Sequence, residues 1–163
     1  MKVALYIGDH AQDSLSARAG WWMTRHTQKG PYGDVTHVEA IHAEYTDGSV
    51  LIASASLRDG GVRDKEVVLN PAHWRIADVD LWDVQASIEL MERTRGKPYD
   101  WRGALATRLP GGHNGDSWFC NEWVGEPFLR ASATFGPHHF AAICLSIGRD
   151  VTREFFLARA RGP

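Results

Sequence analysis

The chain contains little cysteine: only Cys120 and Cys144 among 163 residues. Two cysteines are too few for a disulfide-stabilised scaffold, and they do not form the Cys-x-x-Cys pair typical of zinc ribbons. No apolar stretch reaches the length of a membrane span, and the N-terminal apolar run is interrupted at Asp9, too early for a signal peptide. We therefore expect a protein without a transmembrane segment, located in a reducing cytoplasm where both thiols stay free.

The chain also has little excess charge of either sign. It carries 18 basic and 20 acidic residues, for a formal net charge of -2, which gives no reason to expect nucleic acid as a partner. With 44% hydrophobic residues, the 163 residues are enough for one domain, spanning 1–163, with a core of its own. The seven tryptophans are explained by core packing, or by a substrate groove that some of them line.

Alternating apolar and polar residues predict a strand over 35–45, with His37 and Glu39 on one face and His42 on the other. The Asp47-Gly48 turn that follows predicts a hairpin, and its returning strand covers 50–56. Shorter apolar segments predict further strands, over 3–7, 65–69 and 74–79.

Helical spacing of apolar residues predicts a helix over 82–95, which ends at Gly96. Further helices are predicted, over 14–27, 100–109 and 117–129, the last at least as far as Pro127. Strands gathered in one part of the chain and helices in another indicate the α+β class, with a small antiparallel sheet packed against helices.

Cys120 is the candidate nucleophile. Ser117 is a suitable N-cap, which would place Cys120 in the first turn of its helix, where the helix dipole stabilises a thiolate. A loop rich in glycine, asparagine and aspartate, over 111–116, precedes it and offers backbone N–H groups to a substrate carbonyl. The alternative is an inert buried thiol, which is our interpretation of Cys144 because it lies in the apolar run 140–145.

His37 is the candidate base among eight histidines, because a strand interior would hold its ring rigidly. A purely structural histidine is the alternative. A third polar group should orient the imidazole, and the neighbouring strand is its natural source. We assign that role to Ser54, with Ser56 or Asp59 as alternatives, and we expect Glu39, Trp118 and Tyr32 to contact substrate.

Several short segments, in order along the chain, resemble the circularly permuted branch of the papain-like NlpC superfamily (YiiX-like enzymes). The histidine segment is Trp21-Trp22 through Gly30-Pro31-Tyr32 to Thr36-His37-Val38-Glu39; the later segments are Lys97-Pro98-Tyr99-Asp100-Trp101 and Trp118-Phe119-Cys120-Asn121-Glu122. Residues 54–62 are similar to a segment of bacteriophage-encoded members.

The resemblance implies a permuted papain-like fold, in which a small antiparallel sheet supplies His37 and a helix begins near Cys120. It also implies a cysteine amidase or peptidase that needs no metal or organic cofactor and acts on a peptidoglycan peptide or another N-acyl amide. The resemblance also implies that the protein is encoded by a bacteriophage and can be associated with the virion. This chain departs from the family pattern at Asn121, where a serine is usual, and at Ser54, where relatives often carry a glutamate.

Three other functions stay open at this point. Ser54 in place of a carboxylate favours a catalytically weak binding or host-interaction module, and related permuted enzymes transfer or hydrolyse lipid acyl groups. A metal hydrolase that uses His37, His138 and His139 is a further alternative, although the chain has no His-Glu-x-x-His motif.

Overall fold

The computed structural model describes residues 1–8, 18, 22, 30–106, 116–129 and 136–160. The helix predicted over 14–27 and the loop predicted over 111–116 lie almost wholly outside the described residues. The strands are β1 (Lys2–Tyr6), β2 (His37–Glu44), β3 (Val50–Ser56), β4 (Gly61–Val67), β5 (Trp74–Asp78) and β6 (Arg149–Asp150). The helices are α2 (Val84–Thr94), α3 (Trp101–Ala106), α4 (Cys120–Leu129), α5 (Pro137–Ile147) and α6 (Thr152–Ala160).

The six strands form one antiparallel sheet in the order β4-β3-β2-β1-β5-β6. The Asp-Gly turn connects β2 to β3 as a hairpin, with Gly48 at a φ of 87°. The N-terminal strand β1 pairs with both β2 and β5, so it lies inside the sheet. The predicted α+β class is therefore confirmed.

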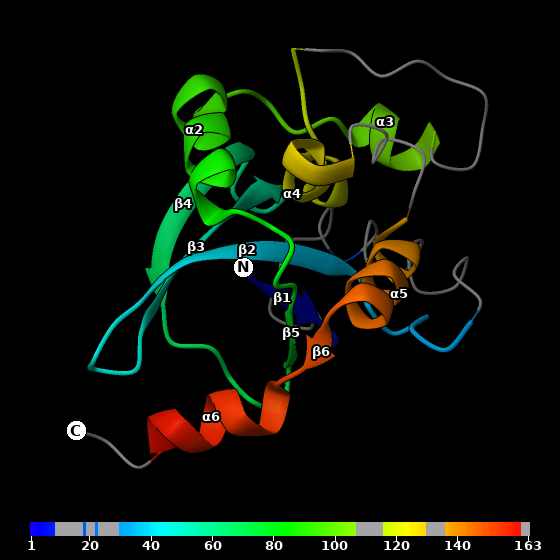
Figure 1. Ribbon diagram of the computed structural model, residues 1–163. Coiled ribbons are helices and arrows are strands. Elements are labelled where there is room, and N and C mark those ends of the chain that lie inside the picture. Colours follow the sequence, from blue (N-terminus) through cyan, green and yellow to red (C-terminus); the bar gives the residue numbers. More distant parts are fainter. Residues whose placement is uncertain (9–17, 19–21, 23–29, 107–115, 130–135, 161–163) are drawn as a thin grey trace.

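Helices cover both faces of the sheet, with α2 and α4 above it and α6 below it in Figure 1. Apolar side chains separate into two clusters in the same way, because successive residues of a strand point to opposite faces. The larger cluster joins sheet residues to α2, α4 and α5: Val3, Leu5, Val38, Ala40, Met91, Trp123 and Phe140 are among its members. The smaller cluster includes Ala4, Ile41, Ile52, Ile76, Val151 and Phe155.

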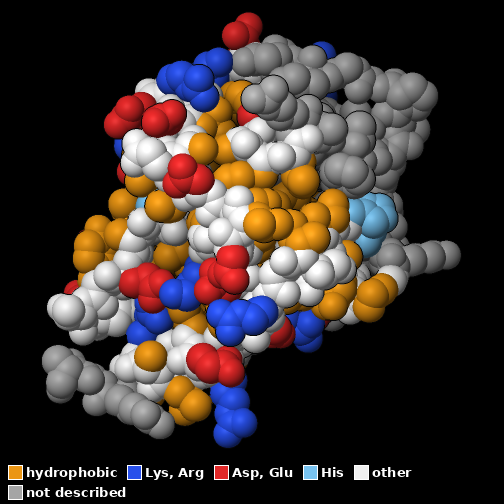
Figure 2. Space-filling view, in the orientation of Figure 1, with side chains coloured by type: hydrophobic (Ala, Val, Ile, Leu, Met, Phe, Trp, Pro, Cys, Tyr) orange, Lys and Arg blue, Asp and Glu red, His pale blue; other side chains and the backbone are white. Residues whose placement is uncertain are grey.

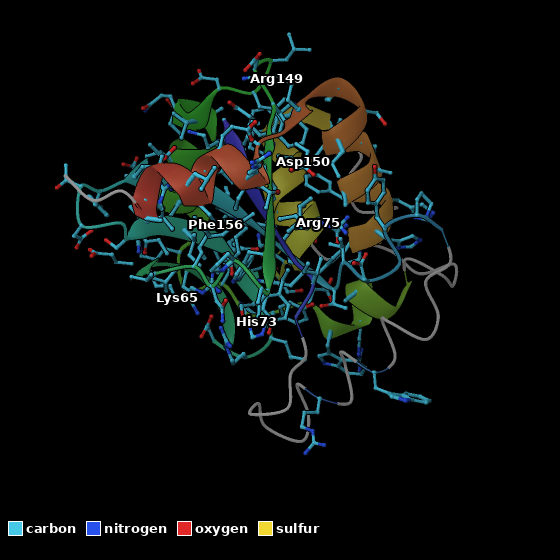
Figure 3. All side chains as sticks on the ribbon, turned by 90° about the horizontal axis from the view of Figure 1, so that it is seen from below. Lys65, His73, Arg75, Arg149, Asp150 and Phe156 are labelled. Carbon is cyan, nitrogen blue, oxygen red and sulfur yellow. The ribbon has the colours of Figure 1, made fainter. Side chains whose placement is uncertain are left out.

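The second face is closed by α6, the helix formed by the arginine-rich C-terminal segment. Figure 3 looks onto this face, where α6 crosses in front of the sheet and carries Phe156. Arg159 of α6 donates a hydrogen bond of 2.6 Å to Glu44 at the end of β2. Glu44 reaches this face because the ladder shifts register between Ile41 and Ala43, so the strict alternation predicted for 35–45 fails at its end.

The face seen in Figure 2 carries acidic and basic side chains interleaved with one another rather than separated by sign. Among the described helices, none is long and apolar enough to cross a membrane.

Two predicted boundaries need correction. The strand predicted over 65–69 runs instead from Gly61 to Val67, because residues 61–64 also pair with β3. Ser117 is not the N-cap of α4, whose first residue is Cys120. The same helix continues through Pro127 to Leu129, where the prediction ends it. The glycine predicted to end α2 does so: Gly96 follows the C-cap with a φ of 79°.

A short extended segment over 96–100 links the edge strand β4 to the residues before α4. Val62 donates its backbone N–H to the Lys97 carbonyl at 2.9 Å, and Tyr99 donates to the Gly60 carbonyl at 3.2 Å. On its other side the segment accepts a hydrogen bond from Trp118 N–H through Pro98 (3.1 Å). This segment therefore fixes the start of α4 relative to the sheet.

Gly61 is required for that close approach, because a Cβ added there would lie 2.1 Å from the Lys97 carbonyl oxygen. We predict that Gly61→Ala lowers the free energy of unfolding by about 3 kcal/mol, through displacement of the 96–100 segment. Gly60→Ala is the control: its added Cβ meets no atom, and only its φ of 82° opposes the substitution, at a cost of about 1 kcal/mol. Equal losses in urea unfolding would contradict this explanation.

Candidate active site

The candidate base His37 is the first residue of β2, and its ring is fixed by a carboxylate two residues further along. Its Nε2 lies 2.8 Å from Oε1 of Glu39, and the His37 side chain is 19% exposed. Residues i and i+2 of a strand point the same way, so Glu39 can reach back to the ring. With Nε2 engaged, Nδ1 is the ring nitrogen left to exchange a proton with a nucleophile.

The candidate nucleophile Cys120 is the first residue of α4, where the backbone N–H groups of the first turn lack helical acceptors. It is 3% exposed, and its Sγ lies 3.7 Å from Oδ1 of Asn121. Instead of Ser117, Glu122 stabilises the beginning of the helix, since its carboxyl group accepts a hydrogen bond from Phe119 N–H at 3.3 Å. The predicted place of Cys120 in the first turn is confirmed, although the predicted cap is wrong.

The structure brings Cys120 and His37 together, from α4 and β2. Burial of the imidazole lowers its pKa, but the neighbouring groups outweigh burial. The negative charge of Glu39 contributes first, followed by the charge of Cys120 and a hydrogen bond with its side chain, and the pKa of His37 rises to about 9. At neutral pH the ring is therefore an imidazolium, which stabilises a thiolate on a neighbouring cysteine. Cys144, by contrast, is fully buried in α5, and burial raises the pKa of its thiol well above the ordinary range.

Glu39 is held from its other side by Arg63 of β4. The guanidinium donates from Nη1 to Oε2 and from Nη2 to Oε1, both at 2.7 Å. Burial of Glu39, which is only 1% exposed, favours its neutral form; the charges and hydrogen bonds of His37 and Arg63 outweigh burial and lower its pKa to about 2. Glu39 is thus an anion between two cations, and it does not line an open cleft as we expected.

Ser54, which we predicted to orient the imidazole, lies elsewhere in the hydrogen-bond network. Its hydroxyl donates to the carbonyl oxygen of Ala55 at 3.4 Å, and the carboxylate of Glu39 occupies Nε2 of His37. The two alternatives are also engaged elsewhere: Ser56 accepts the N–H of Asp59, and Asp59 accepts a hydrogen bond of 2.6 Å from Nε of Arg63. The orienting position predicted for Ser54 therefore belongs to Glu39.

The two aromatic residues that we assigned to substrate contact pack against the core. Trp118 is buried in the larger cluster, and its backbone forms a parallel bridge with Tyr99. Tyr32 is partly buried and packs against the same cluster.

Three ionisable side chains near Cys120 lie in the segments that carry the family resemblance, but our sequence analysis gave them no role. They are Tyr99, Asp100 and Glu122. Burial, and the charges of Cys120 and Asp100, raise the pKa of Tyr99 well above its ordinary value, so it stays protonated. Burial also raises the pKa of Glu122 to about 8; the hydrogen bond from Phe119 opposes this shift, and the charges of Asp100 and Glu126 add to it. A largely neutral Glu122 adds little negative charge beside a thiolate at pH 7.

Three of the other histidines that the structure describes make contacts of their own. Nε2 of His42 lies 2.8 Å from the Ser87 hydroxyl, on the side of the sheet covered by α2. The rings of His138 and His139 contact each other at the beginning of α5, with their centroids 3.8 Å apart. Within the described ranges, no group of three or more histidine, cysteine, aspartate or glutamate side chains is arranged to hold a metal ion.

Comparisons of the chain with protein-family models, with curated proteins and with solved structures found no match.

Two members of the charge network were accessible to sequence reasoning. Glu39 lies two residues from His37 on the same face of the strand, which was the signal for a contact between them. We assigned Glu39 to substrate contact instead. Arg63 was missed because the strand was predicted to begin at Lys65, which left Arg63 outside it.

We predict that His37 titrates near pH 9, and that Glu39→Gln lowers its pKa below about 7, because the substitution removes the anion next to the ring and leaves the Arg63 cation. Histidine NMR as a function of pH measures this. Ser54→Ala is the matched control on the adjacent strand and should leave the titration unchanged. If Ser54→Ala shifts the pKa and Glu39→Gln does not, the assignment of the orienting group is wrong.

The raised pKa also predicts how stability depends on pH. Since the pKa of His37 is about 9 when folded and about 6.5 when unfolded, the protonated ring stabilises the fold fully below pH 6.5. That contribution, up to about 3 kcal/mol, is lost as the pH rises through 9. Urea unfolding at pH 6 and pH 9.5 should show a larger decrease in stability for the wild type than for His37→Gln, and equal decreases would refute the linkage.

Proposed function

We propose that the protein is a cysteine hydrolase that cleaves an amide bond through Cys120 and His37. The observation that carries the proposal is the buried Glu39 carboxylate, which engages Nε2 of the imidazole and, with Cys120, raises the pKa of His37. A nucleophile, a base beside it and an acidic group that orients the base are the three parts of a triad.

In the proposed reaction Nδ1 of His37 already holds the proton of the Cys120 thiol, and the thiolate of this ion pair attacks the amide carbonyl carbon. The oxygen of the tetrahedral intermediate accepts hydrogen bonds from N–H groups at the start of α4, including that of Cys120. His37 then protonates the leaving amine as the C–N bond breaks, which leaves a thioester on Cys120. Water, activated by the neutral imidazole, hydrolyses the thioester and restores the free thiol.

Glu39 supports catalysis over the non-catalytic alternative. That alternative was based on Ser54, because a serine cannot stabilise an imidazolium as a carboxylate does. Glu39 provides the carboxylate at 2.8 Å from the ring, so the feature that favoured a binding module no longer favours it.

The order of elements supports a permuted papain-like arrangement as part of the same proposal. His37 lies on a strand that precedes the helix of Cys120 in the chain, which is the order expected of the permuted branch. We propose as substrate a peptidoglycan peptide or another N-acyl amide, as the family resemblance implies. Transfer or hydrolysis of a lipid acyl group would pass through the same kind of thioester on Cys120. The two reactions differ in the molecule that accepts the acyl group.

An acylation experiment tests the proposed reaction. The protein is incubated with a panel of muropeptides, N-acyl amides and phospholipids, quenched in acid, and its intact mass is measured. We expect a mass increase equal to the acyl group of one substrate, mapped to Cys120 and absent in Cys120→Ser. Acylation from phospholipids alone would assign the protein to lipid acyl chemistry, and hydrolysis that persists in Cys120→Ser would contradict the proposal.

We predict that iodoacetamide alkylates Cys120 near pH 7 at least tenfold faster than it alkylates Cys120 in His37→Ala, because the imidazolium stabilises the attacking thiolate. Peptide mapping by mass spectrometry measures both cysteines in one sample. Cys144 is the internal control, since its buried thiol should react only after unfolding. Equal and slow reaction of Cys120 in both proteins would show that the pair is not activated.

A further inference from the structure

Arg63 directs three N–H donors at two carboxylates, and Glu39 receives two of the three. Both oxygens of Glu39 accept from the guanidinium at 2.7 Å, in the two-point geometry that fixes a carboxylate in plane, and Oε1 also contacts His37. The Nε of Arg63 donates to Asp59, which in turn accepts a hydrogen bond of 2.9 Å from Lys65. The five charges therefore alternate in sign from the candidate base to the sheet edge.

The strand register explains how Arg63 reaches Glu39 across an intervening strand. Arg63 pairs with Ser54 on β3, and the ladder that pairs Ala53 with Ala40 places Ser54 next to Glu39. The three residues thus form one row on one face, over two interstrand spacings of about 4.8 Å each. The small side chain of Ser54 leaves the arginine room to extend over it.

Stability alone is a weak explanation for this arrangement. Burying a carboxylate and a guanidinium costs several kcal/mol in lost hydration, so a buried ion pair is often no more stabilising than apolar residues of the same volume. Two-point binding, however, removes the rotation of the carboxylate about its last bond, which the single contact with His37 does not. The oxygen that faces Nε2 is thereby fixed in position.

We propose that Arg63 is a positioning residue of the candidate active site, which sets the orientation of the Glu39 carboxylate and through it the orientation of the His37 ring toward Cys120. This inference rests on the proposed function. It assigns to β4, which contacts neither the thiol nor the imidazole through the hydrogen bonds described, a role in the chemistry of both.

Three variants test the inference. Arg63→Met removes the charge and all donors while keeping an unbranched side chain, and Arg63→Lys keeps the charge but loses the two-point geometry. Lys65→Met is the matched control, because Lys65 lies on the same strand and touches Asp59 but not Glu39. Circular dichroism and urea unfolding establish whether each variant is folded.

The first measurement is the rate of Cys120 alkylation by iodoacetamide at pH 7. We expect a decrease of about tenfold or more in Arg63→Met and about threefold in Arg63→Lys, with the rate unchanged in Lys65→Met. The second is the downfield NMR resonance of the Nε2 proton of His37, which requires a fixed acceptor. It should be present in the wild type and Lys65→Met, broadened in Arg63→Lys and absent in Arg63→Met.

Loss of stability without a change in the alkylation rate or in the Nε2 proton would show that Arg63 is only structural. If Arg63→Met does not fold, the test depends on Arg63→Lys. A wild-type alkylation rate together with a wild-type Nε2 proton resonance in Arg63→Lys would overturn the inference. The proposed function fails differently, when the wild type itself shows no alkylation that depends on His37 or forms no acyl-enzyme. The Nε2 proton still reports on Arg63 in that case.

Discussion

The buried carboxylate of Glu39 is the constraint on which the arrangement of the site depends. An isolated anion at 1% exposure would be protonated or would disrupt the fold, so Glu39 needs a cation on each side. His37 provides one from the same strand, and Arg63 provides the other from two strands away. The pairing of β2, β3 and β4 is therefore tied to the charge state of the candidate base, because a slip of one residue would turn Arg63 to the other face.

The nucleophile is placed by a different kind of contact, made by backbone rather than by charge. The 96–100 segment hydrogen-bonds to β4 on one side and to Trp118 on the other, two residues before Cys120. Gly61 allows the segment to approach β4 closely. The same strand thus carries both Arg63 and the backbone that supports the start of α4, and β4 links the orientation of the base to the position of the thiol.

Away from the candidate site, the face of the sheet that carries Ala4, Ile41 and Ile52 has a structural task. There α6 covers the smaller apolar cluster, and Arg159 binds the end of β2 through Glu44. Regular alternation points His42 toward α2, and the register shift between Ile41 and Ala43 turns Glu44 toward α6, so β2 anchors helices on both faces beyond the candidate site. The candidate site lies at the beginning of β2, away from this irregularity.

Local chemistry in the sequence determined much of this protein. Alternation predicted β2 and β3, the Asp-Gly pair predicted their turn, and apolar spacing with Gly96 predicted α2, because each depends on residues close together in the chain. The positions of Cys120 on a helix and His37 on a strand followed in the same way. Only the tertiary structure decided that Glu39, and not Ser54, contacts His37, and that Arg63 completes the network. The His37–Glu39 contact lies within one strand, but the contact of Arg63 depends on pairing between β2, β3 and β4, whose register is set by burial and by the close approach at Gly61, which no short stretch of sequence records.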